Sequence, residues 1–212
     1  MKLIKPGYEI LSEINREAIL KRIEITGRTC YKSEEKITEE SASKFVKGIV
    51  KAGHLSVIEH VNITVKFICD RGVTHELVRH RLASYSQEST RYCNYSGGVT
   101  FIIPPWIDIK EGEYNDDNSY AICSGFLSTH WYDHMFLCEK TYKYLITNGW
   151  SPQQARSVLP NSLKTEIVTT CNLREWKHIF NLRCSEKAHP QIREIMIPLK
   201  EELKSILPEI YG

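Results

Sequence analysis

The chain has 212 residues, of which 42% are hydrophobic and 25% are charged. This composition excludes a disordered chain, a collagen-like repeat and a disulfide-stabilised miniprotein. The formal net charge of +2 argues against a protein that coats nucleic acid, so any anion site must be local. No apolar run is longer than four residues, and the seven cysteines include no Cys-x-x-Cys pair. We therefore expect a cytoplasmic protein with reduced thiols and no membrane partner.

The first part of the chain predicts a helix, a strand and a second helix. Apolar residues recur at helical spacing over residues 38–51. Residues 61–67 alternate between apolar and polar side chains, a pattern typical of a half-buried strand. We expect Gly72 to end this strand, and Thr74 to cap a helix whose apolar stripe runs to Leu82.

The middle of the chain predicts a loop, a short strand and a long helix. Residues 84–98 are rich in Ser, Tyr, Asn and Gly and have no period, which predicts an ordered surface loop. A short strand is expected at 99–103 and an acidic turn at 111–117. The pattern over 119–147 predicts a core helix. Its inward face is expected to carry Phe126, Leu127, His130, Trp131, His134, Leu137 and Leu145.

The C-terminal part has clear helix starts. A Ser-Pro pair predicts a short helix over residues 152–159, and β-branched residues predict a strand over 163–170. A capping box that includes Glu175 opens a helix over 172–183, whose N-terminus is suited to an anion. An amphipathic helix over 190–207 closes the chain.

These elements predict an α/β protein of the α+β type, with a small, mostly antiparallel sheet and several long helices. The sequence contains no internal repeat and no Gly/Ser linker. We therefore expect a single domain over residues 1–212.

The densest polar group of the sequence runs from a helix end into the predicted loop. Its guanidinium groups suit phosphate or carboxylate, and its hydroxyl and amide groups suit a heterocycle, as a nucleotide site requires. The alternative is an exposed basic helix end that only balances the helix dipole. The group consists of Arg79, His80, Arg81, Ser84, Ser86, Gln87, Ser89, Arg91 and Tyr92.

Arg79-His80-Arg81, followed after seven residues by Ser89, matches the signature of the flavin-dependent thymidylate synthase family. The segment His-Leu-Ser-Val-Ile-Glu-His at 54–60 resembles the family's segment before its strand. The resemblance covers most of the chain in the correct order. It extends to residues 27–31, 155–156, 159–160, 172–174 and 181–183.

The resemblance implies the reductive methylation of dUMP to dTMP. In such a reaction methylenetetrahydrofolate is the carbon donor, reduced FAD supplies hydride, and NADPH reduces the flavin again. It also implies an α/β homotetramer with active sites between subunits, and no nucleic-acid partner.

By resemblance, Arg183 would be the catalytic residue, because a guanidinium stays protonated and can stabilise negative charge that spreads over the pyrimidine. No metal site is implied. Residues that would contact FAD, some from a neighbouring subunit, are Ser56, Arg79, His80, Arg81, Gln87, Asn172, Leu173, Arg174 and His178. Residues that would hold the nucleotide are Glu76, Arg79, Gln87, Glu88, Ser89, Thr90, Arg91, Arg156 and Arg183.

Several positions depart from the family pattern. Glu76 stands where several members have Gln, and an acid near a phosphate is unfavourable, so it either accepts from the base or ribose or points away. Ser86 and Gln87 stand where Asn and Glu are frequent. His178 replaces an Asn found in some members, which keeps hydrogen bonding and adds a titratable ring.

The residues suggest three other chemical roles. His130 and His134 have the i, i+4 spacing of a zinc site, but packed core histidines are the expected reading. Cys184 follows an arginine, yet an inert thiol is expected. Ser89 has no triad partner in the sequence to make it a nucleophile.

The alternative function is a module that binds single-stranded nucleic acid. Such a module would combine cations with stacking tyrosines on one surface. The low net charge argues against it, as does the lack of a recognised nucleic-acid motif. The residues of this surface would be Arg79, Arg81, Tyr85, Arg91, Tyr92 and Tyr95.

Overall fold

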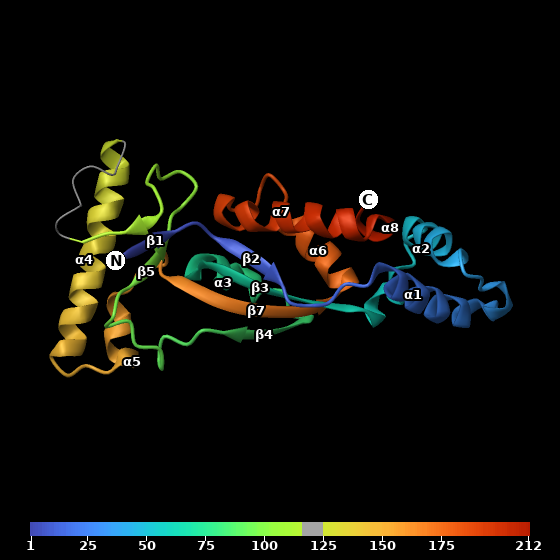
Figure 1. The fold of residues 1–212 in the computed structure, drawn as a ribbon, viewed down its shortest axis with the longest axis horizontal. Helices are drawn as coiled ribbons and strands as arrows, with labels where there is room; N and C mark the ends of the chain where they lie inside the picture. The colour runs from blue at the N-terminus through green and yellow to red at the C-terminus, as the bar shows by residue number, and fades with distance from the viewer. Residues whose placement is uncertain (116–124) are drawn as a thin grey trace. The chain divides into compact units, whose positions relative to one another are not determined.

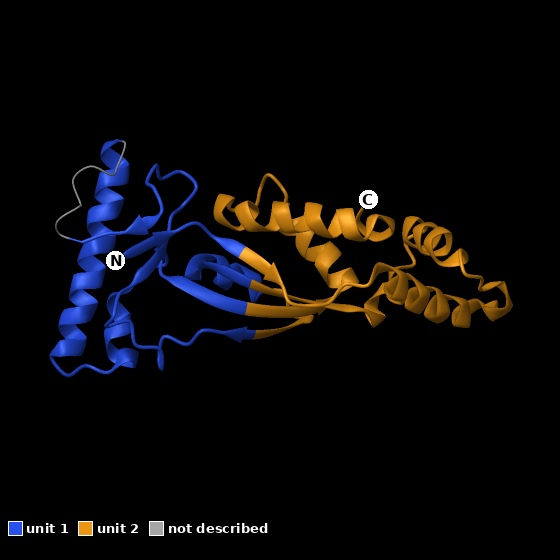
Figure 2. Cartoon of the chain, viewed as in Figure 1, with its two compact units in different colours: residues 1–7, 67–79, 86–167 blue, residues 8–66, 80–85, 168–212 orange. Residues whose placement is uncertain are grey.

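A computed structural model describes residues 1–115 and 125–212, and the chain divides into two compact units (Figure 2). The single domain expected over the whole chain stays a prediction. Unit 1 contains residues 1–7, 67–79 and 86–167, and unit 2 contains residues 8–66, 80–85 and 168–212.

The strands form two small sheets, whereas the sequence predicted one (Figure 1). The mixed α/β architecture is confirmed. The three-stranded sheet has the order β5-β1-β6, with β1 parallel to β5 and antiparallel to β6. The four-stranded sheet has the order β2-β3-β7-β4. The strand bounds are β1 Lys2–Ile4, β2 Gly7–Ile10, β3 Asn62–Asp70, β4 Ala83–Gln87, β5 Thr100–Ile102, β6 Gly112–Glu113 and β7 Lys164–Asn172.

The central strands β3 and β7 confirm the clearest strand predictions, and both continue beyond the predicted ends. In β7, every second side chain is buried over all nine residues. This period of two places one face of the strand against a core. The short strand β5 likewise confirms the prediction for residues 99–103.

The helix after β3 begins and ends earlier than predicted. Helix α3 spans Arg71–Leu77, and the Asp70 side chain caps it by accepting the Val73 N–H at 2.9 Å. Gly72 therefore lies inside the helix, where an added Cβ would come within 2.9 Å of Asp70 Oδ1. Because the helix ends at Leu77, only the first part of the predicted apolar stripe is confirmed: Val73 and Leu77 are buried, whereas Leu82 is 74% exposed.

The predicted loop over residues 84–98 begins with a strand. Strand β4 occupies residues 83–87 and pairs with β7 at the end of the sheet order. Its side chains alternate between exposed and half-buried, so no apolar periodicity announces it. The pairing comes from β7, a partner far away in the sequence.

The long helix α4, Phe126–Thr147 (Figure 1), buries residues that differ from those predicted, although Trp131 and Leu145 pack against the core. Phe126 and Leu127 are 77% and 78% exposed. Two inward positions are polar because they serve backbone donors: Glu139 accepts the Val99 N–H at 2.9 Å, and Ser128 accepts the Asp108 N–H at 3.3 Å. The buried residues are Ser128, Tyr132, Met135, Cys138, Glu139 and Tyr142. The parts of the predicted turn and helix at 116–124 lie outside the described residues.

The C-terminal elements confirm the sequence closely. Helix α5 (Pro152–Ala155) starts with the capping box of Ser151 and continues into the short η3 turn (Arg156–Val158). Helix α7 (Pro190–Ile206) is followed by α8 (Pro208–Tyr211). None of the described helices is long and apolar enough to span a membrane.

The sequence did not predict helix α1, Arg16–Tyr31, which packs against α2, Ser41–Lys51. A Cβ on Gly27 would lie 2.7 Å from the Phe45 ring, so glycine is needed for this close approach. Glu24 is also buried and accepts from Arg28 Nε at 2.8 Å. Two non-apolar residues on the inward face thus hide the helical period. The short turns η1 (Glu34–Lys36) and η2 (Leu55–His60) complete unit 2.

Candidate active site

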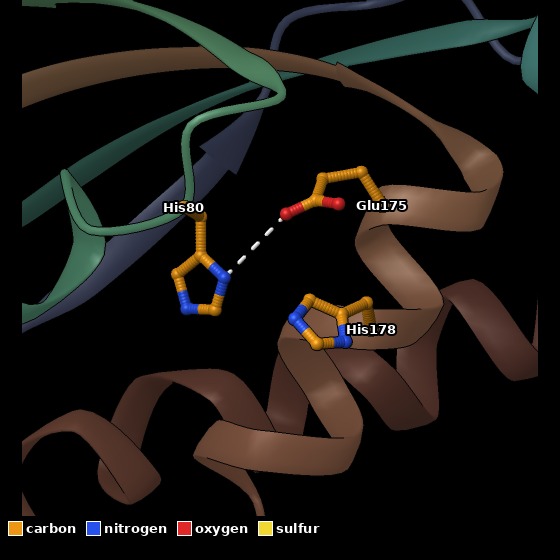
Figure 3. Close-up of side chains that lie close together, drawn as sticks. All are labelled: His80, Glu175 and His178. Carbon is orange, nitrogen blue, oxygen red and sulfur yellow. Dashed lines mark ion pairs between the residues drawn. The ribbon is translucent and has the colours of Figure 1, made fainter.

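In unit 2, a buried histidine lies between an arginine and a carboxylate, and Figure 3 shows the histidine and the carboxylate. His80 is 5% exposed. Its Nε2 accepts the Nε–H of Arg183 at 3.0 Å, and its Nδ1 lies 3.5 Å from Glu175 Oε1. The His178 ring meets the His80 ring edge-on, with centroids 5.7 Å apart. These four residues are called the imidazole cluster below.

Helix α6, Leu173–Arg183, places three of the four residues on one face. Positions 175, 178 and 183 fall at i, i+3 and i+8, which lie together on a helix. Asn172 caps the helix by accepting the Glu175 N–H at 2.9 Å. The capping residue predicted from sequence is therefore confirmed. The carboxylate of Glu175 lies instead toward His80 (Figure 3).

Packing on both sides fixes the imidazole cluster. The buried Trp176 donates its Nε1–H to the Ile63 carbonyl at 3.1 Å and stacks on Phe180. On the other side, the Tyr85 hydroxyl donates to the His80 carbonyl at 2.7 Å. The Trp176 bond thus fixes helix α6, which carries Glu175 and His178, and the Tyr85 bond fixes the backbone of His80.

Burial controls the charge states of the cluster. It lowers the pKa of His80 to about 4, with further lowering by the nearby Arg183 and His178. Burial also raises the pKa of Glu175, which His178 partly offsets. His80 is therefore a neutral imidazole at neutral pH, with one nitrogen that donates and one that accepts.

The ligand atoms of His80, Glu175 and His178 lie within 4.8 Å of one another, a spacing that could hold a metal ion. The hydrogen bonds oppose this use. The accepting Nε2 of His80 already faces the Arg183 Nε–H, and a metal on Nδ1 would have to displace its proton. A cation would also lie next to a guanidinium. The arrangement therefore favours an organic ligand over a metal.

The histidines of α4 are not packed in a core, so that prediction is wrong. His130 and His134 are both exposed. His130 packs its ring against Phe126 with centroids 4.2 Å apart, and His134 Nε2 lies 3.7 Å from Cys138 Sγ. The cause is the rotated inward face of α4, which points both imidazoles outward.

In unit 1, the signature loop meets the segment after α5. Arg156 Nη1 donates to Thr90 Oγ1 at 3.2 Å. Ser89 Oγ accepts the Arg91 N–H at 3.3 Å, which shapes the turn that follows β4. Two distant segments, near residue 90 and near residue 156, thus present hydroxyl and guanidinium groups together.

The acid and the amide at the start of this loop are already bound. Glu88 accepts from Lys164 Nζ at 3.0 Å and from the Tyr95 hydroxyl at 2.8 Å. Gln87 donates its amide to Thr74 at 3.0 Å and to Thr165 at 3.3 Å. The sequence pointed to neither of these networks, because Lys164 and Tyr95 are separated in the chain from the signature.

The predicted site residues divide between the units. Asn172, Arg174, Glu175 and His178 of unit 2 line one cavity, described next. Unit 1 carries Glu76, Arg79, Gln87, Glu88, Ser89, Thr90, Arg91 and Arg156. Unit 2 carries Ser56, His80, Arg81, Asn172, Leu173, Arg174, His178 and Arg183. Leu173 is fully buried; it donates its N–H to the Val61 carbonyl and accepts from the Tyr211 hydroxyl.

A cavity of about 370 Å³ opens beside the imidazole cluster. Arg174 lines this cavity and pairs with Glu59 at 2.5 Å. The cavity therefore offers an amide, an imidazole and a guanidinium together with two carboxylates. Its lining residues are Glu59, Leu82, Asn172, Arg174, Glu175 and His178. Sequence analysis recognised Glu175 only as part of a cap, and the sole signal for its role was its spacing from His178 and Arg183.

The alternative chemistries receive little support from the geometry. Burial raises the pKa of the Cys184 thiol, so it is not an activated nucleophile. Of the three tyrosines in the proposed stacking surface, only Tyr92 is exposed; Tyr85 and Tyr95 are half-buried and donate their hydroxyls to His80 and Glu88. A continuous stacking platform needs exposed rings.

Comparison with known proteins identifies the family of the chain. A family model described as thymidylate synthase complementing protein matches residues 14–209. The chain is 32% identical over 197 residues to a flavin-dependent thymidylate synthase of Geobacter sulfurreducens, covering 89% of this chain and 79% of the relative. It is 37% identical over 181 residues to one of Pyrococcus furiosus, covering 84% and 68%.

The fold is shared with a solved structure, a UMP/dUMP methylase PolB from Streptomyces cacaoi bound with 5-Br dUMP. The TM-score is 0.76 at 22% identity, and the match covers 100% of this chain and 95% of the other. The family model and the relatives above 30% identity each extend over most of the chain. The chain therefore belongs to the flavin-dependent thymidylate synthase family.

Proposed function

We propose that this protein converts dUMP to dTMP, with methylenetetrahydrofolate as carbon donor, FAD as the hydride-transferring cofactor and NADPH as the reductant. Family membership supports the reaction, since the relatives are flavin-dependent thymidylate synthases. The methylase that shares its fold binds a dUMP analogue. Residues of the chain would bind FAD and the nucleotide and would activate the pyrimidine base.

The observation that carries the proposal is the meeting of the signature stretch with the C-terminal segments at two places. His80 accepts from Arg183 in unit 2, and Arg156 donates to Thr90 in unit 1. Each contact joins residues more than sixty positions apart in the sequence. Within each unit, an arginine expected to serve the nucleotide therefore contacts the signature stretch.

The cavity next to the imidazole cluster fits the ring end of a flavin better than its phosphates. Its volume of about 370 Å³ is at the lower end for small-molecule sites, so it has room for part of a dinucleotide. Amide and imidazole groups from Asn172 and His178 can bond a heterocycle. The carboxylates of Glu59 and Glu175 would repel a phosphate at this position.

When bound, FAD would supply the hydride chemistry that no side chain offers. Residues that would hold it are Ser56, Arg79, His80, Arg81, Gln87, Asn172, Leu173, Arg174 and His178. For His80 and Leu173 the role is support of the site, because the ring nitrogens of His80 and the backbone N–H and carbonyl of Leu173 face groups of the protein. No metal takes part.

For the nucleotide, the chain offers separate groups for the phosphate and the base. Ser89, Arg91 and Arg156 would bind the phosphate, because guanidinium groups and hydroxyls make charge-assisted hydrogen bonds to it. Arg183 would stabilise negative charge on the pyrimidine. The remaining residues proposed to touch the nucleotide are Glu76, Arg79, Gln87, Glu88 and Thr90.

The proposed enzyme is a cytoplasmic homotetramer in which one domain, residues 1–212, forms each subunit. The exposed apolar side chains of α4, Phe126 and Leu127, support contact with another copy, since such residues are commonly covered in assemblies. Light scattering of the purified protein measures the mass directly.

The experiment is reconstitution of the purified protein with FAD. Incubation with dUMP, methylenetetrahydrofolate and NADPH should yield dTMP, with one NADPH oxidised per dTMP. Omission of any single component should abolish the product. Flavin binding without dTMP formation under any of these conditions would refute the proposed reaction. Tight, strongly salt-dependent binding of oligonucleotides by a colourless protein would favour the nucleic-acid module instead.

A further inference from the structure

We infer that Glu175 is a positioning residue: by holding the proton of His80 on Nδ1, it keeps Nε2 as the acceptor that orients the guanidinium of Arg183. The effect on turnover rests on the proposed function. The positioning itself is a property of the folded chain, with or without ligands.

The neighbours of His80 determine which of its ring nitrogens carries the proton. A neutral imidazole carries one N–H and one lone pair on its two nitrogens. Arg183 cannot accept a hydrogen bond, so the nitrogen that faces its Nε–H must be the lone-pair nitrogen, Nε2. The proton is then on Nδ1, and the neighbouring acceptor is Glu175 Oε1 at 3.5 Å.

Without the Glu175 carboxylate, the His80 proton would lose the acceptor that holds it on Nδ1. In the other tautomer, the Nε2–H of His80 would face the Nε–H of Arg183, two donors with no acceptor between them. The ring has little room to escape this conflict, since His80 is 5% exposed and its carbonyl is held by Tyr85. The arginine side chain is the part that would have to move.

Glu175 is a buried acid, 7% exposed. Burial raises the pKa of Glu175, so the position is unfavourable for an acid that serves packing alone. The backbone of both Glu175 and His80 is fixed, since Asn172 caps the helix that carries Glu175 and Tyr85 binds the His80 carbonyl. A rigid, desolvated acceptor next to an imidazole is an arrangement that fixes a tautomer.

A consequence for His80 follows. Its Nε2 accepts from Arg183 and its Nδ1 lies 3.5 Å from Glu175 Oε1, so both ring nitrogens face groups of the protein. Its contribution to a bound flavin or nucleotide is therefore exerted through Arg183. Glu175 lines the cavity and also acts on Arg183 through His80.

The first test is the tautomer of His80 in the FAD-free protein, from the ¹⁵N shifts of its imidazole by NMR. The signal is identified by its loss in His80→Gln. The wild type and Glu175→Gln, whose amide oxygen can still accept, should show Nδ1–H. Glu175→Leu should show a large fraction of Nε2–H. An Nε2–H signal in the wild type, or an unchanged tautomer in Glu175→Leu, would overturn the inference.

The matched control is Glu209→Leu. Glu209 is another buried carboxylate of unit 2, but it binds Arg16 and Ser43. Its removal should lower the melting temperature and leave the His80 tautomer unchanged. If it shifts the tautomer as much as Glu175→Leu does, general loosening of unit 2 explains the effect and the inference fails.

The second test is steady-state kinetics of the FAD-loaded variants. Glu175→Leu should lower kcat about 10-fold with little change in KM for dUMP, because a misplaced group costs rate more than affinity. Glu175→Gln should restore most of kcat. Equal losses in the two variants would contradict positioning through the tautomer. If the wild type makes no dTMP, the proposed function fails, whereas the NMR result still decides the role of Glu175.

Discussion

Unit 2 contains two arginine–carboxylate groups that are built differently. Arg16 binds Glu209 directly, through Nε and a terminal nitrogen, and Ser43 donates to the same carboxylate at 2.6 Å. Arg183 donates instead to His80, and Glu175 lies on the far side of that ring. The first group joins opposite charges, whereas the second places a neutral ring between them.

The charge states of the two acids differ accordingly. Burial acts to raise the pKa of Glu209, but the Ser43 hydrogen bond and the Arg16 guanidinium hold it below its usual range. Burial raises the pKa of Glu175. A direct, satisfied pair stabilises the fold, whereas a desolvated acid beside a neutral imidazole stabilises an orientation at some cost to the fold.

The largest expected difference is in turnover. Arg183→Lys should lower kcat by about 10²-fold, the cost of removing one positioned donor to developing charge, while the fold and flavin binding persist. Arg16→Lys should leave kcat within about 2-fold, since its guanidinium serves a structural carboxylate. Steady-state rates of dTMP formation provide the measurement. Similar losses in both variants would erase the distinction, and unchanged turnover in Arg183→Lys would remove that residue from its assigned role.

The next difference is in stability. Glu209→Gln should cost about 1–2 kcal/mol at pH 7, because a charge-assisted hydrogen bond is lost while half-exposed Arg16 is rehydrated. The folded pKa of Glu209 is depressed, so its contribution is present above the unfolded pKa of about 4.3 and is lost as pH falls through the folded value. Urea unfolding of wild type and variant at several pH values measures this. A cost that stays constant down to pH 3 would contradict the assigned ion pair.

A third arginine extends the comparison to unit 1. Arg91 is exposed, and its guanidinium lies 5.4 Å from the centroid of the Tyr92 ring. Arg91→Lys should raise KM for dUMP about 10-fold with nearly unchanged kcat, as expected where a phosphate loses a bidentate partner. The exposed Arg22 provides the control, and Arg22→Lys should leave both constants unchanged. A fall in kcat with unchanged KM would exchange the roles proposed for Arg91 and Arg183.

Sequence patterns predicted the elements whose burial is regular. The side chains of strand β7 alternate between half-buried and buried over its whole length. The predicted strand, residues 163–170, therefore differs from the observed one by one residue at its start and two at its end. Helix α4 is rich in apolar residues but buries Ser128 and Glu139, which bond backbone groups elsewhere in unit 1. Counting apolar residues could not reveal that its inward face is partly polar, because the reason lies in distant donors.

The candidate site shows the same limit. The signature of Arg79 to Arg81 with Ser89 was enough to indicate the family. The partners of those residues were not visible, since Glu175 has a local explanation as a cap residue and Lys164 lies within a strand. Which atom of His80 faces which neighbour depends on tertiary contacts between segments about a hundred residues apart.

The smallest expected effect has the opposite sign to that of Glu209 and concerns stability alone. Because the folded pKa of Glu175 is raised, its ionised form costs stability as pH rises from the unfolded pKa of about 4.3 through the folded value. Glu175→Gln should therefore gain stability relative to wild type between pH 4 and pH 8, by less than about 1 kcal/mol. Urea unfolding at both pH values, compared as differences so that other titrations cancel, measures it. If the stability of Glu175→Gln relative to wild type instead falls as pH rises, as expected for Glu209→Gln, then Glu175 stabilises the fold in the same way as Glu209.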